Sequence, residues 1–286
     1  MNEASAEPWK ERFRGIRVVE VRRAQQVTPL MRRITLGGPE LVSVPRGPNV
    51  KLLFPPRGIE AAWPRRGPEG KAIWPEPERR PVTRTYSVRR DDRTAREIDV
   101  DFVLHGHGPA ARWAAEARPG DVIGIGGPGG LTVREAQFYL LAGDHSALPA
   151  IARILENLPQ DAKGLALIEI PGPDEEQQLR RPDGVPVEWL HRREAAGQPT
   201  VLEESVRAMR WPDTARVFAW VGAESTTARA LKAYIRDEHR LDRRQFLAMG
   251  YWRLGMSEAE YHQAFDHDRG DEYHQNRREF DAAHAD

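Results

Sequence analysis

The chain has 286 residues, which is enough for two domains, and 40% of them are hydrophobic, as in a globular protein. Basic and acidic residues both number 43, so the net charge does not favour nucleic acid or a membrane surface. The absence of cysteine excludes disulfides, iron–sulfur ligation and thiol catalysis. The sequence has no apolar run of about 18 residues and its N-terminus is polar, so we expect a cytoplasmic protein without a membrane partner.

The first half of the chain has the pattern of an antiparallel β domain. Short alternating segments, separated by turn residues, predict strands at 18–21, 31–36, 50–54, 82–88, 98–105 and 122–125. An alanine-rich segment, 108–117, begins with Gly-Pro and predicts a short helix between two of these strands. The segment 55–81 is rich in Pro, Gly and Arg and has no periodicity, so we expect a long loop, either a lid or a disordered excursion.

A glycine-rich run at 124–129 formally matches the dinucleotide-binding fingerprint, and Asp144 follows about 20 residues later. That fingerprint requires a helix directly after the glycines, with its N-terminus aimed at a diphosphate. Here Pro128 interrupts the run and 131–133 leads towards another strand. We therefore reject a dinucleotide site at this run and interpret it as a glycine-rich crossing between domains.

The second half of the chain alternates buried strands with helices. Apolar runs predict strands at 138–142, 165–170, 217–221 and 245–249, and helical spacing predicts helices at 151–158, 202–209 and 231–235. This alternation is typical of a parallel sheet covered on both faces, which binds ligands beyond the carboxyl ends of its strands. Those ends are 143–144, 222–224 and 250–253. We expect the charged C-terminal tail to be helical or frayed.

The run Arg84-Thr85-Tyr86-Ser87 has the chemistry of a flavin site. Arginine can pair bidentately with a phosphate, tyrosine can cover an isoalloxazine ring, and serine can hydrogen-bond its redox-active edge. An Arg/Tyr/Ser strand is, by itself, more often simply a half-solvated strand. The order of the surrounding motifs favours the flavin.

The motifs, in this order, resemble the siderophore-interacting protein family, the FAD-dependent ferric-siderophore reductases of the ferredoxin-reductase-like group. The resemblance covers about residues 15–261. It rests on 84–87, 99–105, 108–113, 119–121, 127–130, 143–150 and 250–253. It implies an N-terminal antiparallel Greek-key FAD-binding β-barrel followed by a C-terminal parallel-sheet α/β domain of the nicotinamide-binding kind. We expect a tail at 1–14, the barrel at 15–135, the α/β domain at 136–265 and a charged tail at 266–286.

The resemblance also assigns residues to ligands. It implies no catalytic acid or base and no metal site. The cofactor-binding positions it implies are Arg84, Thr85, Tyr86, Ser87, Asp101, Val103, Leu104, His105, Gly108, Pro109, Ala110, Ala111, Trp113, Asp144 and Ser146. Glu224 matches less closely, because Gly222 and Ala223 stand in swapped order. Lys51 and Arg253 match basic positions for the chelate.

Each assignment has a structural alternative. His105 could end a strand, Lys51 could be a solvated side chain, and Asp144 or Glu224 could cap a helix. Tyr251 and Trp252 could lie in the core. The histidines of the tail are interpreted as surface residues.

The function that the resemblance implies is flavin-dependent reduction of a ferric siderophore, which releases ferrous iron in the cytoplasm. The expected cofactor is FAD, and the expected electron donor is NADH or NADPH, with a reduced ferredoxin as the alternative. Two alternatives stay open: a ferric-siderophore-binding protein without turnover, and a general flavin reductase. We expect a monomer, because the sequence has no heptad seam and no long apolar surface run.

Overall fold

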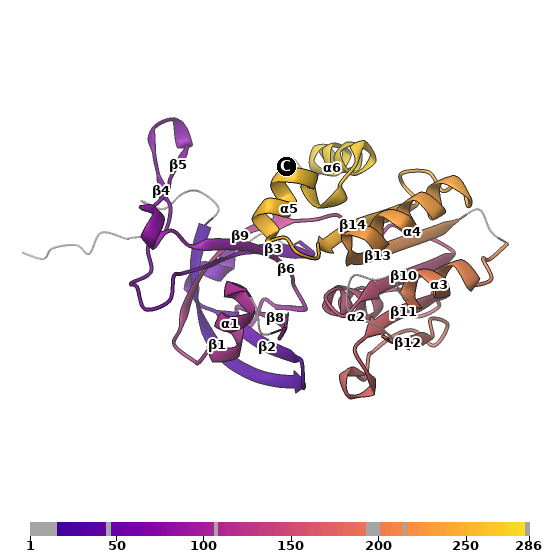
Figure 1. The fold of residues 1–286 in the computed structure, drawn as a ribbon, viewed down its shortest axis with the longest axis horizontal. Coiled ribbons are helices and arrows are strands. Elements are labelled where there is room, and N and C mark those ends of the chain that lie inside the picture. The colour runs from indigo at the N-terminus through magenta and orange to yellow at the C-terminus, as the bar shows by residue number, and fades with distance from the viewer. Residues whose placement is uncertain (1–15, 44–46, 106–107, 193–200, 214–215, 284–286) are drawn as a thin grey trace, which may run out of the picture. The chain divides into compact units, whose positions relative to one another are not determined.

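The computed structural model of the protein describes residues 16–43, 47–105, 108–192, 201–213 and 216–283. These residues form two compact units, described separately below (Figure 1). The first unit contains the described residues of 1–25, 33–100 and 104–129, and the second contains 26–32, 101–103 and the described residues from 130 onward. The predicted N-terminal tail, 1–14, lies outside the described residues.

Most of the first unit is an antiparallel sheet. Within the described residues it has seven strands: β1 (Ile16–Thr28), β2 (Met31–Gly37), β3 (Asn49–Phe54), β6 (Val82–Ser87), β7 (Arg90–Asp92), β8 (Glu97–Val103) and β9 (Val122–Gly129). Their order is β6-β3-β9-β1-β2-β8-β7, and helix α1 (Pro109–Glu116) follows β8. The predicted β strands and short helix are confirmed, while β7 was not predicted.

The glycine-rich run 124–129 is part of strand β9, so the prediction of a crossing between domains was wrong. β9 pairs with both β1 and β3. A Cβ on Gly124 would lie 2.9 Å from the Trp63 ring and from Leu53, which explains the glycine at this position of the strand. The rejection of a dinucleotide fingerprint is confirmed, because β9 continues where a helix would have to begin.

The segment 55–81 is not a structureless loop. It contains a small hairpin of β4 (Arg65–Arg66) and β5 (Ala72–Ile73), whose strands are connected by a 3-10 turn at Pro68–Gly70, and a second 3-10 turn follows at Pro77–Arg79. These elements are two or three residues long, so they are too short to produce a periodic hydrophobic pattern.

The second unit contains a parallel sheet, and with it the predicted fold class is confirmed. Its five strands within the described residues are β10 (Phe138–Asp144), β11 (Gly164–Ile170), β12 (Val187–His191), β13 (Val217–Glu224) and β14 (Phe246–Trp252), in the order β12-β11-β10-β13-β14. The chain moves outward from β10 in one direction and from β13 in the other. The strand order therefore reverses between β10 and β13, and a crevice at that point is the usual ligand site of such sheets.

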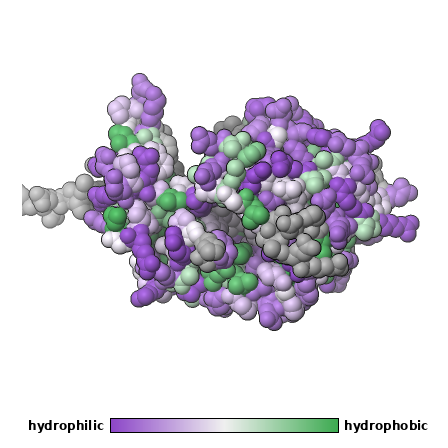
Figure 2. Space-filling view, in the orientation of Figure 1, coloured by the Kyte–Doolittle hydropathy of each residue, from purple (hydrophilic) through white to green (hydrophobic). Residues whose placement is uncertain are grey.

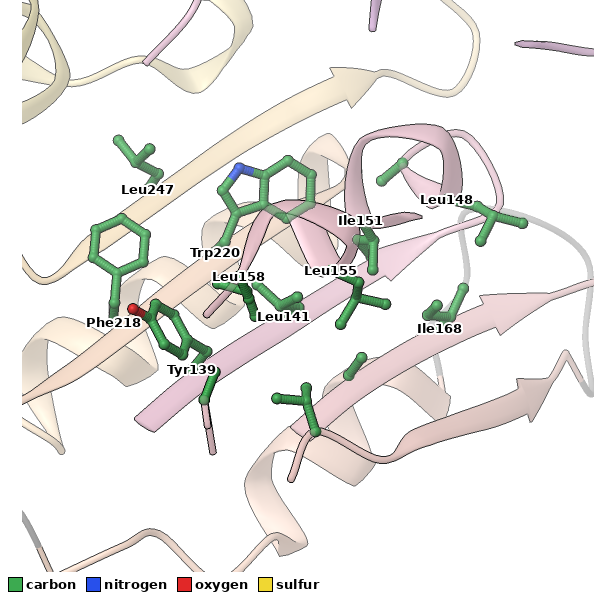
Figure 3. Close-up of a cluster of buried hydrophobic side chains, with 14 of the residues drawn as sticks. Tyr139, Leu141, Leu148, Ile151, Leu155, Leu158, Ile168, Phe218, Trp220 and Leu247 are labelled. Carbon is green, nitrogen blue, oxygen red and sulfur yellow. The ribbon is translucent and has the colours of Figure 1, made fainter. Parts of the chain in front are cut away.

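Helices cover both faces of this sheet. They are α2 (Leu148–Asn157), α3 (Val201–Ala208), α4 (Ser225–Asp237), α5 (Glu258–Phe265) and α6 (Asp271–Ala283). On one face, side chains of α2 pack among buried residues such as Leu141, Ile168 and Trp220, as Figure 3 shows. On the other face, α3 and α4 cover Leu140 and Val221. Alternate residues of one strand thus enter two separate cores.

The charged tail is helical over α6, and polar contacts hold this helix in place. Asn276 is 2% exposed; its Oδ1 accepts from the Arg243 guanidinium at 2.6 Å and its Nδ2 donates to the Arg243 carbonyl oxygen at 2.5 Å. Glu279 pairs with Arg243 at 2.5 Å and with Arg244 at 3.2 Å. Tyr273 and Phe280 add apolar contacts with the core beneath.

Figure 2 shows a surface on which hydrophilic residues prevail and hydrophobic ones are scattered. Among the helices of the described residues, none combines the length and the apolar character that crossing a bilayer requires.

The attachment of α6 should depend on pH through Glu279. The hydrogen bond from Arg243, with a further one from Arg244, lowers the pKa of the Glu279 carboxyl to about 2. A depressed pKa stabilises the fold above the ordinary carboxyl value and loses this effect as pH falls towards 2. We expect Glu279→Gln to lower the free energy of unfolding in urea at pH 7, and the difference from wild type to shrink below pH ~4.5. A difference that is constant with pH would contradict this account.

Candidate functional site

Strands β3 and β6 of the first unit pair in a register that sorts the candidate residues onto two faces. Leu52 lies opposite Arg84, and Lys51 lies opposite Thr85. Because side chains alternate along a strand, Arg84 and Tyr86 share one face, whereas Thr85 and Ser87 share the other with Lys51. All four residues from Arg84 to Ser87 are half-buried, and Lys51 is exposed.

A buried aromatic side chain connects the β6 strand to helix α1. Phe54 is 1% exposed, and its ring lies 6.1 Å from the ring of Tyr86 and 5.4 Å from that of Trp113, edge to face in both cases. Such pairs are favourable beyond the area that they bury. The Arg84 and Tyr86 face of β6 is therefore the one against which α1 packs. Sequence analysis placed Phe54 on a strand but missed this role.

The N-terminus of helix α1 has the features of an anion-binding site. Gly108 precedes it with φ of 80°, a conformation that favours glycine, and Pro109 occupies the first turn. Within the described residues, the N-cap Gly108 makes no side-chain cap hydrogen bond to the first backbone N–H groups of this helix. Ala110 and Ala111 are small and buried, so a ligand can approach the backbone closely. The start of α1 thus presents backbone donors suited to a phosphate.

The remaining candidates of the first half lie on or after β8. Asp101 is buried and Val103 half-buried at the end of this strand, and both group with the second unit. Leu104 is half-buried and His105 exposed, and both group with the first unit. A Cβ added to Gly108 would lie 3.8 Å from His105 Cε1, which places the imidazole next to the start of α1.

In the second unit, Asp144 joins the carboxyl ends of three strands. Its Oδ1 accepts from the Ser146 N–H at 2.9 Å and from the Ser146 hydroxyl at 2.5 Å. Its Oδ2 accepts from the Glu224 N–H and from the Trp252 indole N–H, both at 2.8 Å. Asp144 is 5% exposed, and these donors occupy the acceptor positions of a carboxylate. The half-buried Ser146 is the more accessible of the two predicted ligands.

Glu224 and Arg253 also have protein partners at this edge. The Glu224 side chain caps helix α4 by accepting from the Thr226 N–H at 2.5 Å, and it accepts from the Leu254 N–H at 3.3 Å. The alternative of a helix cap is thus confirmed for Glu224. Arg253 donates to the Ser225 hydroxyl at 3.0 Å and lies over the Phe265 ring at 4.3 Å.

A buried histidine, which sequence analysis did not single out, lies directly after Asp144. His145 is 3% exposed, and its Nε2 is 3.1 Å from Oε2 of the buried Glu175. Glu175 also accepts from the Thr28 hydroxyl at 2.5 Å and from the Leu30 N–H at 2.8 Å. Burial lowers the pKa of His145, so we expect a neutral imidazole at pH 7. The signal was its position inside the Asp-x-Ser motif, but its burial depends on contacts far away in sequence.

The first-unit residues fit a flavin dinucleotide. The start of α1 and Arg84 offer donors to a diphosphate, and Tyr86 offers a half-buried ring on the same face. The residues that the structure describes contain no group of three or more His, Asp or Glu side chains arranged to hold a metal ion.

Comparison with known proteins gives matches to both halves of the chain. Residues 20–132 match the siderophore-interacting FAD-binding domain, and residues 136–255 match the siderophore-interacting protein family. A ferric vibriobactin reductase, ViuB of Vibrio cholerae, is 34% identical over 86% of this chain and 93% of its own. An NADPH-dependent ferric-chelate reductase of Escherichia coli is 31% identical over 84% of this chain and 93% of its own.

Solved structures agree with the fold described above. The siderophore-interacting protein SipS of Aeromonas hydrophila superimposes with a TM-score of 0.77 and 34% identity, over 87% of this chain and 96% of its own. A ferredoxin NADP+ reductase of Neisseria gonorrhoeae, 13% identical, superimposes with a TM-score of 0.58 over 83% of this chain and 99% of its own. The second likeness shows the fold alone.

The Asp144 carboxylate should matter more for stability than the half-buried Ser146 that donates to it. We expect Asp144→Ala to lower the free energy of unfolding by about 2–4 kcal/mol, because it leaves the buried Glu224 N–H and the Trp252 indole without acceptors. Ser146→Ala, the control, removes one donor and should cost about 1 kcal/mol or less. Urea unfolding of both variants checks this, and equal losses would contradict the assignment.

Proposed function

This chain belongs to the siderophore-interacting protein family, and we propose that it is an FAD-dependent ferric-siderophore reductase. The matches cover both the FAD-binding half and the second half of the chain. Two relatives that match almost along their whole length are named as ferric reductases. A siderophore-binding protein without turnover would leave the flavin strand and the start of α1 without a role. We propose further that the protein acts as a monomer in the cytoplasm.

The observation that carries the FAD assignment is the shared face of β3 and β6. Arg84 and Tyr86 lie on it, and Phe54 connects that face to α1. We assign the diphosphate to Arg84 and to the backbone from Gly108 to Ala111, and the flavin ring to Tyr86. Ser87 and His105 are proposed to contact the edge of the flavin, as the family motif implies.

FAD, when bound, supplies a centre that takes two electrons from a donor and passes them on singly to a metal. The chain itself has to bind and orient the reactants, and it needs no catalytic acid or base. Ferric ion is hard and prefers the oxygen ligands of a siderophore, whereas ferrous ion binds them less tightly, so reduction favours release. General flavin reduction without chelate preference is the remaining alternative.

We assign the ferric siderophore to the basic side chain of Lys51. Lys51 is exposed on β3, on the face that it shares with Thr85 of the neighbouring strand β6. Arg253, the second basic candidate, directly follows β14 in the second unit and is engaged with Ser225 and Phe265, so we do not assign the chelate to it. A cation at Lys51 attracts an anionic chelate without forming a covalent bond.

A nicotinamide dinucleotide is the proposed electron donor. Its proposed place is the crevice between β10 and β13, where strand order reverses and Ser146 is accessible. The NADPH dependence in the name of the E. coli relative supports this donor class. NADH is the second candidate, and a reduced ferredoxin is the alternative. Stopped-flow bleaching of the flavin by each donor separates the three.

Arg84→Ala should weaken FAD binding, because a charge-assisted hydrogen bond to phosphate contributes about 1.5–3 kcal/mol. We expect the dissociation constant of FAD to rise roughly 10–100-fold. Titration of the apoprotein, followed by flavin fluorescence, measures it. The control is Arg57→Ala, which replaces an exposed arginine paired with Glu116 in the same unit. Wild-type affinity in Arg84→Ala would contradict the phosphate assignment.

Lys51→Ala should raise KM for an anionic ferric siderophore about 2–5-fold, because a surface charge pair contributes at most about 1 kcal/mol. The maximal rate should be unchanged, since the interaction is made equally before and during reduction. Steady-state reduction, followed by a ferrous-specific dye, checks this against Lys163→Ala, an exposed lysine of the second unit. A wild-type KM in Lys51→Ala would remove Lys51 from the chelate site.

A further inference from the structure

Helix α5 covers the end of β14 through one buried tyrosine. Tyr261 is 1% exposed, and its hydroxyl lies against the backbone of Gly250, where any Cβ would overlap it. The hydroxyl donates to Asp268 Oδ2 at 2.5 Å and is hydrogen-bonded to Ser225. Burial raises the pKa of Tyr261, so the hydroxyl keeps the proton that it donates. Gly250 and Ser225 both lie at the carboxyl edge of the sheet, beside the crevice assigned to the donor.

The rest of α5 is held weakly. Tyr261 is the one buried residue of this helix, while most of its other residues are exposed. The helix begins independently of the sheet, with a capping box between Ser257 and Glu260. Before it runs an exposed connection in which Leu254 is 57% exposed and Gly255 has φ of 78°. A helix with so few buried contacts is the kind of element that opens at low free-energy cost.

The segment that follows α5 is strained. Asp266, His267 and Asp268 have φ values of 45°, 55° and 55°, three consecutive left-handed residues that are not glycine. Asp268 is fixed by Tyr261, and Asp266 lies 3.2 Å from His262 of α5 and 2.9 Å from His274 of α6. The strained turn thus persists through contacts that include the Tyr261 hydroxyl, and strain of this kind is typical of switch regions.

Arg253 also contacts α5. Its guanidinium donates to the Ser225 hydroxyl at 3.0 Å and stacks on Phe265, the last residue of α5. Ser225, the first residue of α4, is fully buried beneath these contacts. If α5 lifts, a cation, a hydroxyl and the backbone of Gly250 become accessible together at the carboxyl edge of β13 and β14. These are groups that suit the diphosphate or ribose of a dinucleotide.

We propose that α5 is a lid over the donor crevice and that Tyr261 is the positioning residue that holds it closed. The lid must leave β14 before the nicotinamide dinucleotide binds, so Tyr261 sets the apparent affinity of the donor. The proposal rests on the proposed function, in which the donor is NADH or NADPH. The apparent affinity for a ligand is proportional to the fraction of molecules in the open state, so loosening the lid tightens apparent binding.

Two variants disrupt the contact between Tyr261 and Gly250, each by changing one of the two residues. Tyr261→Phe removes the hydrogen bonds to Asp268 and Ser225 and keeps the ring, while Gly250→Ala places a methyl group where the hydroxyl lies. Tyr234→Phe is the matched control, because it removes a buried tyrosine hydroxyl of α4 that donates to the Arg207 carbonyl oxygen at 3.4 Å.

The experiment follows flavin reduction in the FAD-loaded full chain against NADH and NADPH concentration, by anaerobic stopped flow. We expect both variants to lower the apparent donor dissociation constant roughly 2–10-fold, the net worth of one or two hydrogen bonds, and Tyr234→Phe to leave it unchanged. Hydrogen exchange of the α5 amides should be faster in both variants. Photoreduced enzyme should reduce a ferric chelate at the wild-type rate in every variant.

The outcomes separate the lid from the donor assignment. Faster exchange of α5 without tighter donor binding, in a wild type that a dinucleotide reduces, overturns the lid. Unchanged hydrogen exchange of the α5 amides in both variants shows that Tyr261 does not hold α5 closed, and this result also overturns the lid. Flavin reduction by a dinucleotide that occurs in the variants but not in the wild type strongly supports the lid. If no dinucleotide reduces any of the proteins while photoreduced flavin still reduces the chelate, the donor assignment fails, and the lid proposal with it.

Discussion

A binding site made of two elements needs a fixed spacing between them, and in the first unit the packing of Phe54 fixes the spacing between β6 and α1, the two elements proposed to bind FAD. The Phe54 ring touches the ring of Tyr86 on β6 and that of Trp113 on α1, and it is almost completely buried. The register between β3 and β6 then places Arg84 on the face of this aromatic cluster and Lys51 on the opposite face. Rigid support of this kind keeps a binding site in its productive geometry without cost at the moment of binding.

The carboxyl edge of the sheet in the second unit, where we propose that the electron donor binds, is built differently. Its strand ends are joined by charge-assisted hydrogen bonds to Asp144 and Glu224, and the glycines Gly143 and Gly222 lie side by side where the strand order reverses. A Cβ on Gly143 would lie 2.8 Å from Ala147, so glycine allows α2 to approach the sheet closely. Polar groups that hold each other in this way leave few accessible donors, among them Ser146. Whether a ligand can reach this edge of the sheet therefore depends on which elements cover it.

The sequence indicated those parts whose signals are local. Gly108 and Pro109 mark the start of α1, and apolar runs mark β10, β11 and β13. The features that the sequence did not indicate depend on contacts between residues far apart in the chain. Strand β9 has glycine at position 124 because Trp63 and Leu53 approach it there, and the burial of His145 depends on Glu175, 30 residues later. Strand β12 was missed because Val187–His191 is a short edge strand that includes a charged residue, Glu188. The contact of Tyr261 with Gly250 has no local pattern at all.

The central claim is that the first unit binds FAD through its diphosphate, between Arg84 and the start of α1. Titration of the apoprotein with FAD, FMN and riboflavin, followed by flavin fluorescence, tests it most directly. The account predicts tight binding of FAD and much weaker binding of riboflavin, which has the same ring and no phosphate. Riboflavin binding as tightly as FAD, or no uptake of FAD, would contradict it.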